Sequence, residues 1–182
     1  GLTQLRERVP MRKLIYLLVV LATAGLTYMS TYTLSEREVA IVSRLGDGVF
    51  WYLVMFLLPA LHGSAGLKVS LQMLAVGLFS LLIYKALKRA TVRPRPCETF
   101  NDIHRHAPML DLYSFPSGHT MHAVGFTAVI LAHYPALGLL IAPFALLIAS
   151  SRLVLGLHYP SDVLVGAVIG AAVAWSSFIV FA

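Results

Sequence analysis

The chain has 182 residues, of which 58% are hydrophobic and only 12% are charged, whereas soluble globular domains carry roughly 25% charged residues. A soluble fold of this length cannot bury so much apolar surface, so the composition excludes an ordinary soluble domain and indicates lipid as the solvent for much of the chain. The net charge of +6 indicates basic residues beside a membrane and cations gathered for an anion, and the single Cys97 excludes a disulfide framework and a multi-cysteine metal site.

A transmembrane helix needs about 20 apolar residues, and the first half of the chain offers three such segments. Residues 1–13 form a polar arm, part of which need not be native, and we expect residues 14–182 to form one transmembrane domain. The predicted spans are Leu14–Leu34, the short Val49–Leu61 and Leu67–Leu87. A polar stretch, Ser35 to Asp47, separates the first two, and the longest polar segment, Lys88 to Ser117, follows the third.

The second half is apolar from Thr120 to Leu157, with one break at His133-Tyr134-Pro135. Because Pro135 disfavours helix at the preceding residue, we predict two antiparallel spans over 120–134 and 136–153. A last span starts near Ser161 and runs to the C-terminus. The chain is therefore predicted to be an all-α, polytopic membrane bundle of about six helices. In this topology the polar segments near 88–119 and 151–162 lie on the same side of the membrane.

The first polar segment begins at Lys88 and contains Arg93-Pro94-Arg95-Pro96. Each proline lacks an amide donor and biases the residue before it toward extended backbone, so the third helix must end here and Arg95 is held on stiff chain. Taken alone, Lys88 and Arg95 are equally well explained as basic anchors at a membrane boundary. Arg93 either supplements the attraction for phosphate or anchors the helix.

The next motif, Pro116-Ser117-Gly118-His119, directly precedes the apolar run. It predicts a helix N-terminus, where free amides and the helix dipole favour an anion. Ser117 can cap the helix or donate to a phosphate oxygen, Gly118 allows close backbone approach, and His119 lies at the rim. The alternative is a plain helix cap with a chance histidine. His122, one turn later, is more simply a packed polar residue.

The third motif starts with Ser151-Arg152 and ends with His158 and Asp162. An arginine within an apolar run is costly in lipid and indicates function. If the last helix begins near Tyr159, His158 and Asp162 can face one another, and the carboxylate can hold one imidazole nitrogen while the other stays free as nucleophile or base. A purely structural His–Asp contact is the alternative.

The three motifs together, Lys-x6-Arg-Pro, Pro-Ser-Gly-His and Ser-Arg-x5-His-x3-Asp, resemble the three-part motif of the type 2 phosphatidic acid phosphatase superfamily, in the family's order and without a departure. The resemblance implies a phosphatase whose nucleophile, His158, forms a phosphohistidine. It implies that Asp162 orients His158 and that His119 protonates the leaving oxygen and then activates water. The phosphoryl oxygens would be held by Lys88, Arg95, Ser117, Gly118 and Arg152.

Fixed cations of this kind can stabilise a phosphoryl group without magnesium, so we expect no metal and no cofactor. The expected substrate is a lipid phosphate or pyrophosphate of the phosphatidic acid, phosphatidylglycerophosphate or undecaprenyl pyrophosphate class, and no nucleic acid partner is expected. A phosphotransferase with the same intermediate, a soluble vanadate-dependent haloperoxidase and a non-catalytic lipid transporter are the alternatives. The apolar spans disfavour the haloperoxidase, and the acid–nucleophile pair disfavours the transporter.

The charges beside the first span predict the orientation. Arg6, Arg8, Arg12 and Lys13 precede it, which favours a cytoplasmic N-terminus and an active site on the outer face of a bacterial inner membrane, toward the periplasm or cell exterior. Counting every Lys and Arg favours the reverse orientation, but Lys88, Arg95 and Arg152 are explained by phosphate.

Overall fold

The computed structural model describes residues 35–100 and 111–181, and every regular element in these ranges is a helix. The polar arm, the predicted span Leu14–Leu34 and residues 101–110 lie outside the described residues. The helices are α2 (Glu36–Leu45), α3 (Val49–Thr91), α4 (Pro96–Thr99), α5 (Gly118–His133), α6 (Pro135–Val154) and α7 (Pro160–Val180). Among them α3, α6 and α7 are long and apolar enough to cross a membrane. Large exposed apolar side chains such as Leu140 and Ile179 suit a lipid environment.

Helix α3 is a hairpin with two arms, because the backbone leaves the helical region at Gly63 (φ 58°, ψ −135°). That positive φ favours glycine. A Cβ on Gly66 would lie 2.0 Å from the Leu58 carbonyl oxygen, so the arms approach at backbone contact. The Ser70 hydroxyl donates to the Met55 carbonyl (2.7 Å) across the same interface. The break therefore falls between the predicted segments Val49–Leu61 and Leu67–Leu87, and the second arm continues to Thr91.

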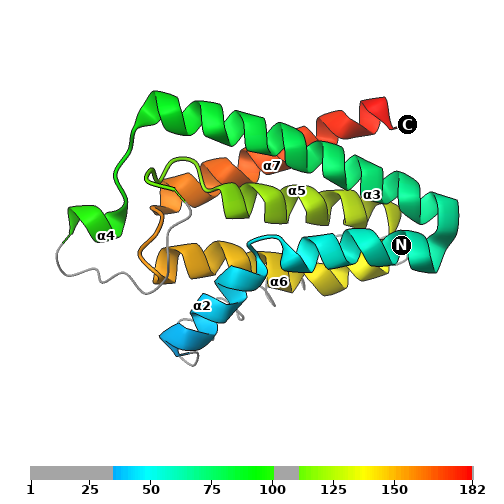
Figure 1. Cartoon of the computed structure of the whole chain (residues 1–182), viewed down its shortest axis with the longest axis horizontal. Coiled ribbons are helices and arrows are strands. Elements are labelled where there is room, and N and C mark those ends of the chain that lie inside the picture. The colour runs from blue at the N-terminus through cyan, green and yellow to red at the C-terminus, as the bar shows by residue number, and fades with distance from the viewer. Residues whose placement is uncertain (1–34, 101–110, 182) are drawn as a thin grey trace, which may run out of the picture.

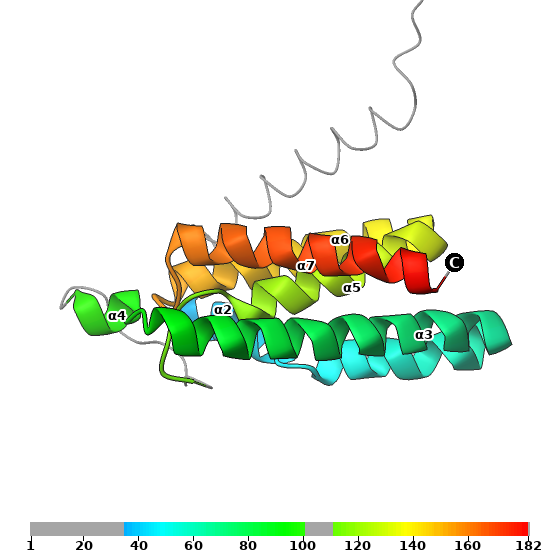
Figure 2. The ribbon, with the colours of Figure 1, turned by 90° about the horizontal axis from the view of Figure 1, so that it is seen from above.

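Helix α5 is the centre of the bundle and contacts α3, α6 and α7 (Figure 1). It ends at His133, and α6 begins at Pro135, so the predicted turn around Tyr134 is confirmed. Small residues bring α5 and α7 together: a Cβ on Gly170 would lie 2.2 Å from the Met121 carbonyl oxygen. Close helix contacts through small residues are typical of membrane bundles. Seen from above, α7 and α6 lie on the side of α5 away from α3 (Figure 2).

The stretch Ser35 to Asp47, expected only to be polar, contains a helix. Helix α2 begins with a capping box, in which Ser35 and Glu38 satisfy each other's backbone amides. On its inner face Val39 forms a small core with Leu155 and Leu157, next to the start of α7. The helix thereby places the turn at Asp47 at the end of the bundle where α3 and α6 end and α5 and α7 begin.

Candidate active site

A cavity of about 270 Å³ opens at this end of the bundle. Six of the eight residues predicted to form the site line it: Lys88, Arg95, Gly118, His119, Arg152 and His158. The other two, Ser117 and Asp162, are fully buried and are absent from its lining. Segments that are far apart in the sequence thus meet around one cavity.

His158 lies in the short link between α6 and α7, and Asp162 lies in the first turn of α7. The His158 Nδ1 is 3.8 Å from Asp162 Oδ2, with both side chains buried. At that distance the contact is not yet a hydrogen bond, and Nδ1 has no hydrogen-bond partner among the described residues. The other ring nitrogen, Nε2, lies 3.4 Å from Arg95 Nη1. The imidazole is therefore placed between a carboxylate and a cation.

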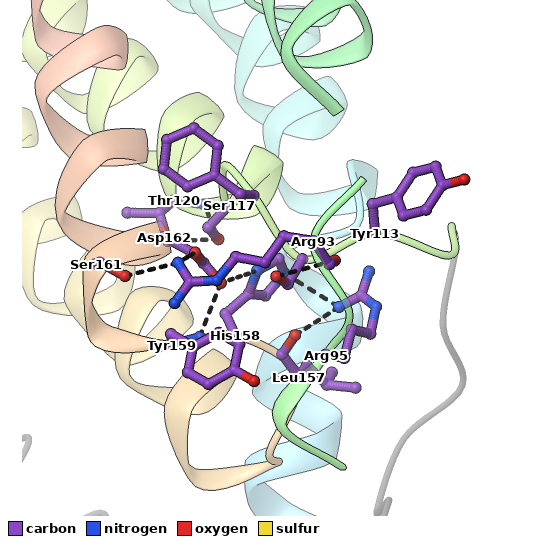
Figure 3. Close-up of polar contacts among 12 residues, drawn as sticks. Arg93, Arg95, Tyr113, Ser117, Thr120, Leu157, His158, Tyr159, Ser161 and Asp162 are labelled. Atoms are coloured by element: carbon purple, nitrogen blue, oxygen red, sulfur yellow. Dashed lines mark hydrogen bonds and ion pairs between the residues drawn. The ribbon is translucent and has the colours of Figure 1, made fainter. Parts of the chain in front are cut away.

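Asp162 is held from three directions (Figure 3). Its Oδ2 accepts from the Tyr159 amide (2.9 Å) at the helix cap. Its Oδ1 accepts from Arg93 Nη1 (2.7 Å), and the same nitrogen donates to Ser161 (2.9 Å). Its backbone carbonyl accepts from the Ser117 amide (3.0 Å), which ties the second motif to the third. Arg93 thus positions the carboxylate, a role that neither sequence interpretation of it anticipated.

The environment of His158 keeps its imidazole neutral. Burial lowers the pKa of His158 to about 4, and the nearby guanidinium and ammonium groups act in the same direction, while Asp162 opposes them. Near pH 7 the ring therefore carries a lone pair on one nitrogen. A neutral imidazole beside fixed cations can act as a nucleophile toward an anionic phosphoryl group.

The three predicted cations are all buried: Lys88 is 5% exposed, Arg95 1% and Arg152 4%. Arg95, at the start of α4, donates to the Leu157 carbonyl (2.7 Å) and the Asp111 carbonyl (3.1 Å). Lys88, in the last turn of α3, donates to the Tyr113 carbonyl (2.5 Å). These backbone acceptors fix Arg95 and Lys88 before any ligand arrives, as stabilisation of a developing anion requires.

Asp111 was not predicted from the sequence. Its Oδ1 accepts from Lys88 Nζ (2.5 Å) and from Arg95 Nη2 (2.7 Å). Burial raises the pKa of Asp111, but the two cations outweigh burial and the pKa lies below its usual value. One ionised carboxylate therefore bridges two of the three cations on the cavity wall. A lone aspartate in a polar segment has no spacing pattern by which it could have been found.

The second motif forms the N-terminus of α5, as predicted. The Ser117 hydroxyl makes a hydrogen bond with the Thr120 hydroxyl (2.9 Å) and accepts from the Thr120 amide (3.5 Å). It therefore caps the helix, and its contact with a phosphate stays a prediction. His122 has its ring nitrogens 2.8 Å from the Gly118 carbonyl and 3.1 Å from the Gly77 carbonyl, so both are held by backbone, and the half-buried ring also lines the cavity.

His119 faces the cavity and is paired with a second residue that sequence reasoning missed. Its Nε2 contacts Oδ1 of Asp47, in the turn between α2 and α3. One helical turn before Asp47, the Ser43 hydroxyl of α2 contacts Arg152 Nη1. The segment before α3 thus contributes to the site, although its sequence suggested only a polar connection between two spans.

Away from the cations the cavity becomes apolar and runs between the two arms of α3. One arm contributes Trp51 and Met55, the other contributes Leu74, Leu78 and Leu81, and Phe126 of α5 lies between them. A pocket that is cationic at one end and apolar along its length matches an amphiphile with a phosphorylated headgroup. Within residues 35–100 and 111–181, no group of three or more His, Cys, Asp or Glu side chains could hold a metal ion.

Known proteins share sequence and fold with this chain. The model of the PAP2 superfamily matches residues 68–182. The chain is similar to lipid A 1-phosphatase of Rhizobium johnstonii, with 36% identity over 109 residues that cover 57% of this chain and 44% of the relative. It is also similar to decaprenylphosphoryl-5-phosphoribose phosphatase of Mycolicibacterium smegmatis, with 42% identity over 99 residues and 51% of each chain covered. The alignments thus span about half of the length of these two relatives.

A solved structure extends the likeness to most of the fold. The crystal structure of Aquifex aeolicus LpxE matches with a TM-score of 0.65 and 25% identity, covering 81% of this chain and 87% of that chain.

Proposed function

The chain belongs to the PAP2 superfamily, and from this membership we propose that it is an integral-membrane phosphatase that hydrolyses a lipid phosphate or pyrophosphate through a phosphohistidine. One observation carries the proposal: a single cavity joins three buried cations and the His158 imidazole to an apolar groove between the arms of α3. The cations match a phosphoryl group, and the groove matches a hydrocarbon chain.

In the first chemical step, His158 Nε2 attacks phosphorus while the bond from phosphorus to the lipid oxygen breaks. The electron pair of that bond stays on the lipid oxygen, which takes a proton from His119. Asp162 accepts a hydrogen bond from His158 Nδ1–H as positive charge develops on the ring. This requires the 3.8 Å separation to shorten to a hydrogen bond, and catalytic hydrogen bonds often tighten only when substrate is bound.

In the second step, water attacks phosphorus and gives a proton to His119. The phosphorus–nitrogen bond breaks, its electrons return to Nε2, and inorganic phosphate leaves. Lys88, Arg95 and Arg152 stabilise the phosphoryl oxygens in both steps, with the amide of Gly118 at the N-terminus of α5. Ser117 supports this wall as the helix cap.

We place the active end on the outer face of the membrane. In a six-span arrangement the predicted first span precedes α2, the two arms of α3 are the second and third spans, and α5, α6 and α7 are the remaining three. Basic residues before Leu14 favour a cytoplasmic N-terminus, which puts the cavity toward the periplasm or cell exterior of a bacterial inner membrane.

A substrate panel tests the function. Purified protein in detergent is given phosphatidic acid, phosphatidylglycerophosphate, a polyprenyl pyrophosphate and a phosphorylated saccharolipid, and released phosphate is measured. We expect release from at least one lipid, inhibition by vanadate and no loss of activity in EDTA. Activity that disappears in EDTA and returns with a divalent metal would contradict metal-free chemistry. Transfer of the phosphoryl group to an added lipid alcohol, in preference to water, would favour the phosphotransferase, and capture without turnover would favour the transporter.

The pH profile tests the state of His158. Because burial lowers the pKa of His158 to about 4, the neutral nucleophile persists as the pH falls through about 6.5, the ordinary imidazole value. The constant kcat/KM reports on the free enzyme and free substrate. We expect protonation of His158 to lower kcat/KM only as the pH approaches 4. The ionisation of the lipid phosphate is titrated by phosphorus NMR in the same micelles and divided out of the profile. An acid limb that remains at the ordinary value would show that His158 titrates as an exposed imidazole.

A further inference from the structure

The cavity contains a second histidine–carboxylate pair, formed by His119 and Asp47. The His119 Nε2 contacts Asp47 Oδ1, and both residues line the cavity together with His158. The two imidazoles are used in opposite ways: His158 turns Nδ1 toward its carboxylate, whereas His119 turns Nε2 toward its own. The Nδ1 of His119 is left for another partner.

The turn that carries Asp47 is packed beside Arg152, one of the cations predicted to bind phosphate. Behind it, Val39 of α2 packs on Leu155 and Leu157. A Cβ on Gly46 would lie 3.0 Å from the side chain of Ile148, so the turn lies directly against α6. One turn of α2 earlier, Ser43 contacts the guanidinium of Arg152. Asp47 is therefore carried by a segment that is packed against the site.

The charges around His119 determine how readily its imidazole keeps a proton, and a carboxylate beside it favours the protonated form. The groups that face it are Arg152 from α6, His122 from its own helix and Asp47, with Lys88, Arg95, Asp111 and His158 around the same cavity. A guanidinium disfavours a protonated imidazole nearby, and an adjacent carboxylate favours it. Burial and the guanidinium of Arg152 both disfavour a proton on His119, and the carboxylate of Asp47 opposes them.

We propose that Asp47 is a positioning residue for the general acid: it holds Nε2 of His119 and favours the protonated ring, so that Nδ1 delivers the proton to the leaving lipid oxygen. This inference rests on the proposed phosphatase function and adds to it a residue outside the three motifs. When the proton has gone to the lipid oxygen, the neutral ring has Nδ1 free to accept a proton from the attacking water.

The leaving group provides the test. Asp47→Asn is compared with the unmodified protein on two phosphate monoesters that carry the same alkyl chain, one an alkyl phosphate and one a nitrophenyl phosphate. Departure of an alkoxide needs a general acid, whereas a nitrophenolate leaves without one. Because general acid catalysis contributes about 10²–10⁴-fold, we expect kcat/KM for the alkyl phosphate to fall about 100-fold and kcat/KM for the nitrophenyl phosphate to fall only a few-fold. The basic limb of the alkyl phosphate profile should move to lower pH in the variant.

Three further variants make the result specific. Asp111→Asn removes the carboxylate that contacts Lys88 and Arg95. It should change kcat/KM for both substrates by the same factor, since Asp111 contacts the cations and not His119. Asp47→Glu should recover part of the loss on the alkyl phosphate, and it carries the comparison if Asp47→Asn fails to fold in detergent. When Asp47→Asn is added to His119→Ala, the further change in kcat/KM should be the same for the two substrates.

The outcomes separate this inference from the function on which it rests. Suppose the unmodified protein hydrolyses both esters, and Asp47→Asn lowers kcat/KM by the same factor for both or lowers it for neither. That result would overturn the role of Asp47 and leave the phosphatase function intact. An unmodified protein that hydrolyses neither these esters nor any lipid phosphate would overturn the proposed function and, with it, the role of Asp47.

Discussion

Replacing His158 by alanine is expected to reduce phosphate release by about 10⁴-fold or more, the scale seen when a covalent nucleophile is removed. Among the described residues that line the cavity, no other group offers the same combination of a neutral imidazole, a buried carboxylate behind it and a guanidinium beside its second nitrogen. His119 cannot substitute, because Asp47 holds its Nε2 and its Nδ1 is needed to deliver the proton to the leaving oxygen. The measurement is phosphate released from the best lipid of the panel.

A second readout identifies the covalent step. After a brief reaction with radiolabelled lipid phosphate and an alkaline quench, the unmodified protein should carry acid-labile label and His158→Ala should carry none. His62→Ala is the matched control, because His62 is exposed at the bend of the α3 hairpin, is stacked on Tyr134 and does not line the cavity, so this variant should keep full turnover. Near-normal turnover in His158→Ala would exclude the phosphohistidine route, and binding of vanadate by that variant would show that the loss is not a loss of fold.

The path of the chain through the described bundle was predictable where hydropathy and backbone chemistry agree. Apolar runs of membrane length gave the positions of α6 and α7, and Pro135 marked the turn that separates α5 from α6. The convergence of the cations was predictable for a related reason: an arginine such as Arg152 in an apolar run needs a buried anion or acceptor. The count of spans then places Arg152 and the other polar segments on the same side of the membrane.

The residues that were missed share a different property. Asp47 and Asp111 are single carboxylates in polar connections, where solvated charge is the ordinary expectation and no periodic pattern marks a carboxylate that faces a site. Their importance depends on how α2 packs against α6 and on where residue 111 meets the end of α3, and both are tertiary contacts. Ser117 illustrates the converse, because a serine before a helix can cap it or donate to a ligand, and the hydroxyl caps α5.

The partners of Arg95 predict the second large effect, that of Arg95→Lys. The guanidinium donates to the Leu157 and Asp111 carbonyls and to the Asp111 carboxylate, and its Nη1 lies 3.4 Å from His158 Nε2. A lysine keeps the charge, but as a single point it cannot span these acceptors and face a phosphoryl oxygen as well. Removing one such preorganised donor typically costs about 10²–10³-fold in kcat, and we expect a loss of that size with the charge conserved.

Arg89→Lys is the matched control, because Arg89 is exposed in the last turn of α3 and the same exchange there should be silent. The comparison uses kcat and KM for the preferred lipid, the inhibition constant for vanadate and the melting temperature in detergent. We expect weaker vanadate inhibition alongside the fall in kcat, since vanadate occupies the place of the phosphoryl group. If Arg95→Lys instead lowered the melting temperature and left kcat of the folded fraction unchanged, the role of Arg95 would be structural, joining α4 to the link before α7. The fork geometry, more than the charge, is what ties the first motif to the nucleophile, and this pair of substitutions measures it.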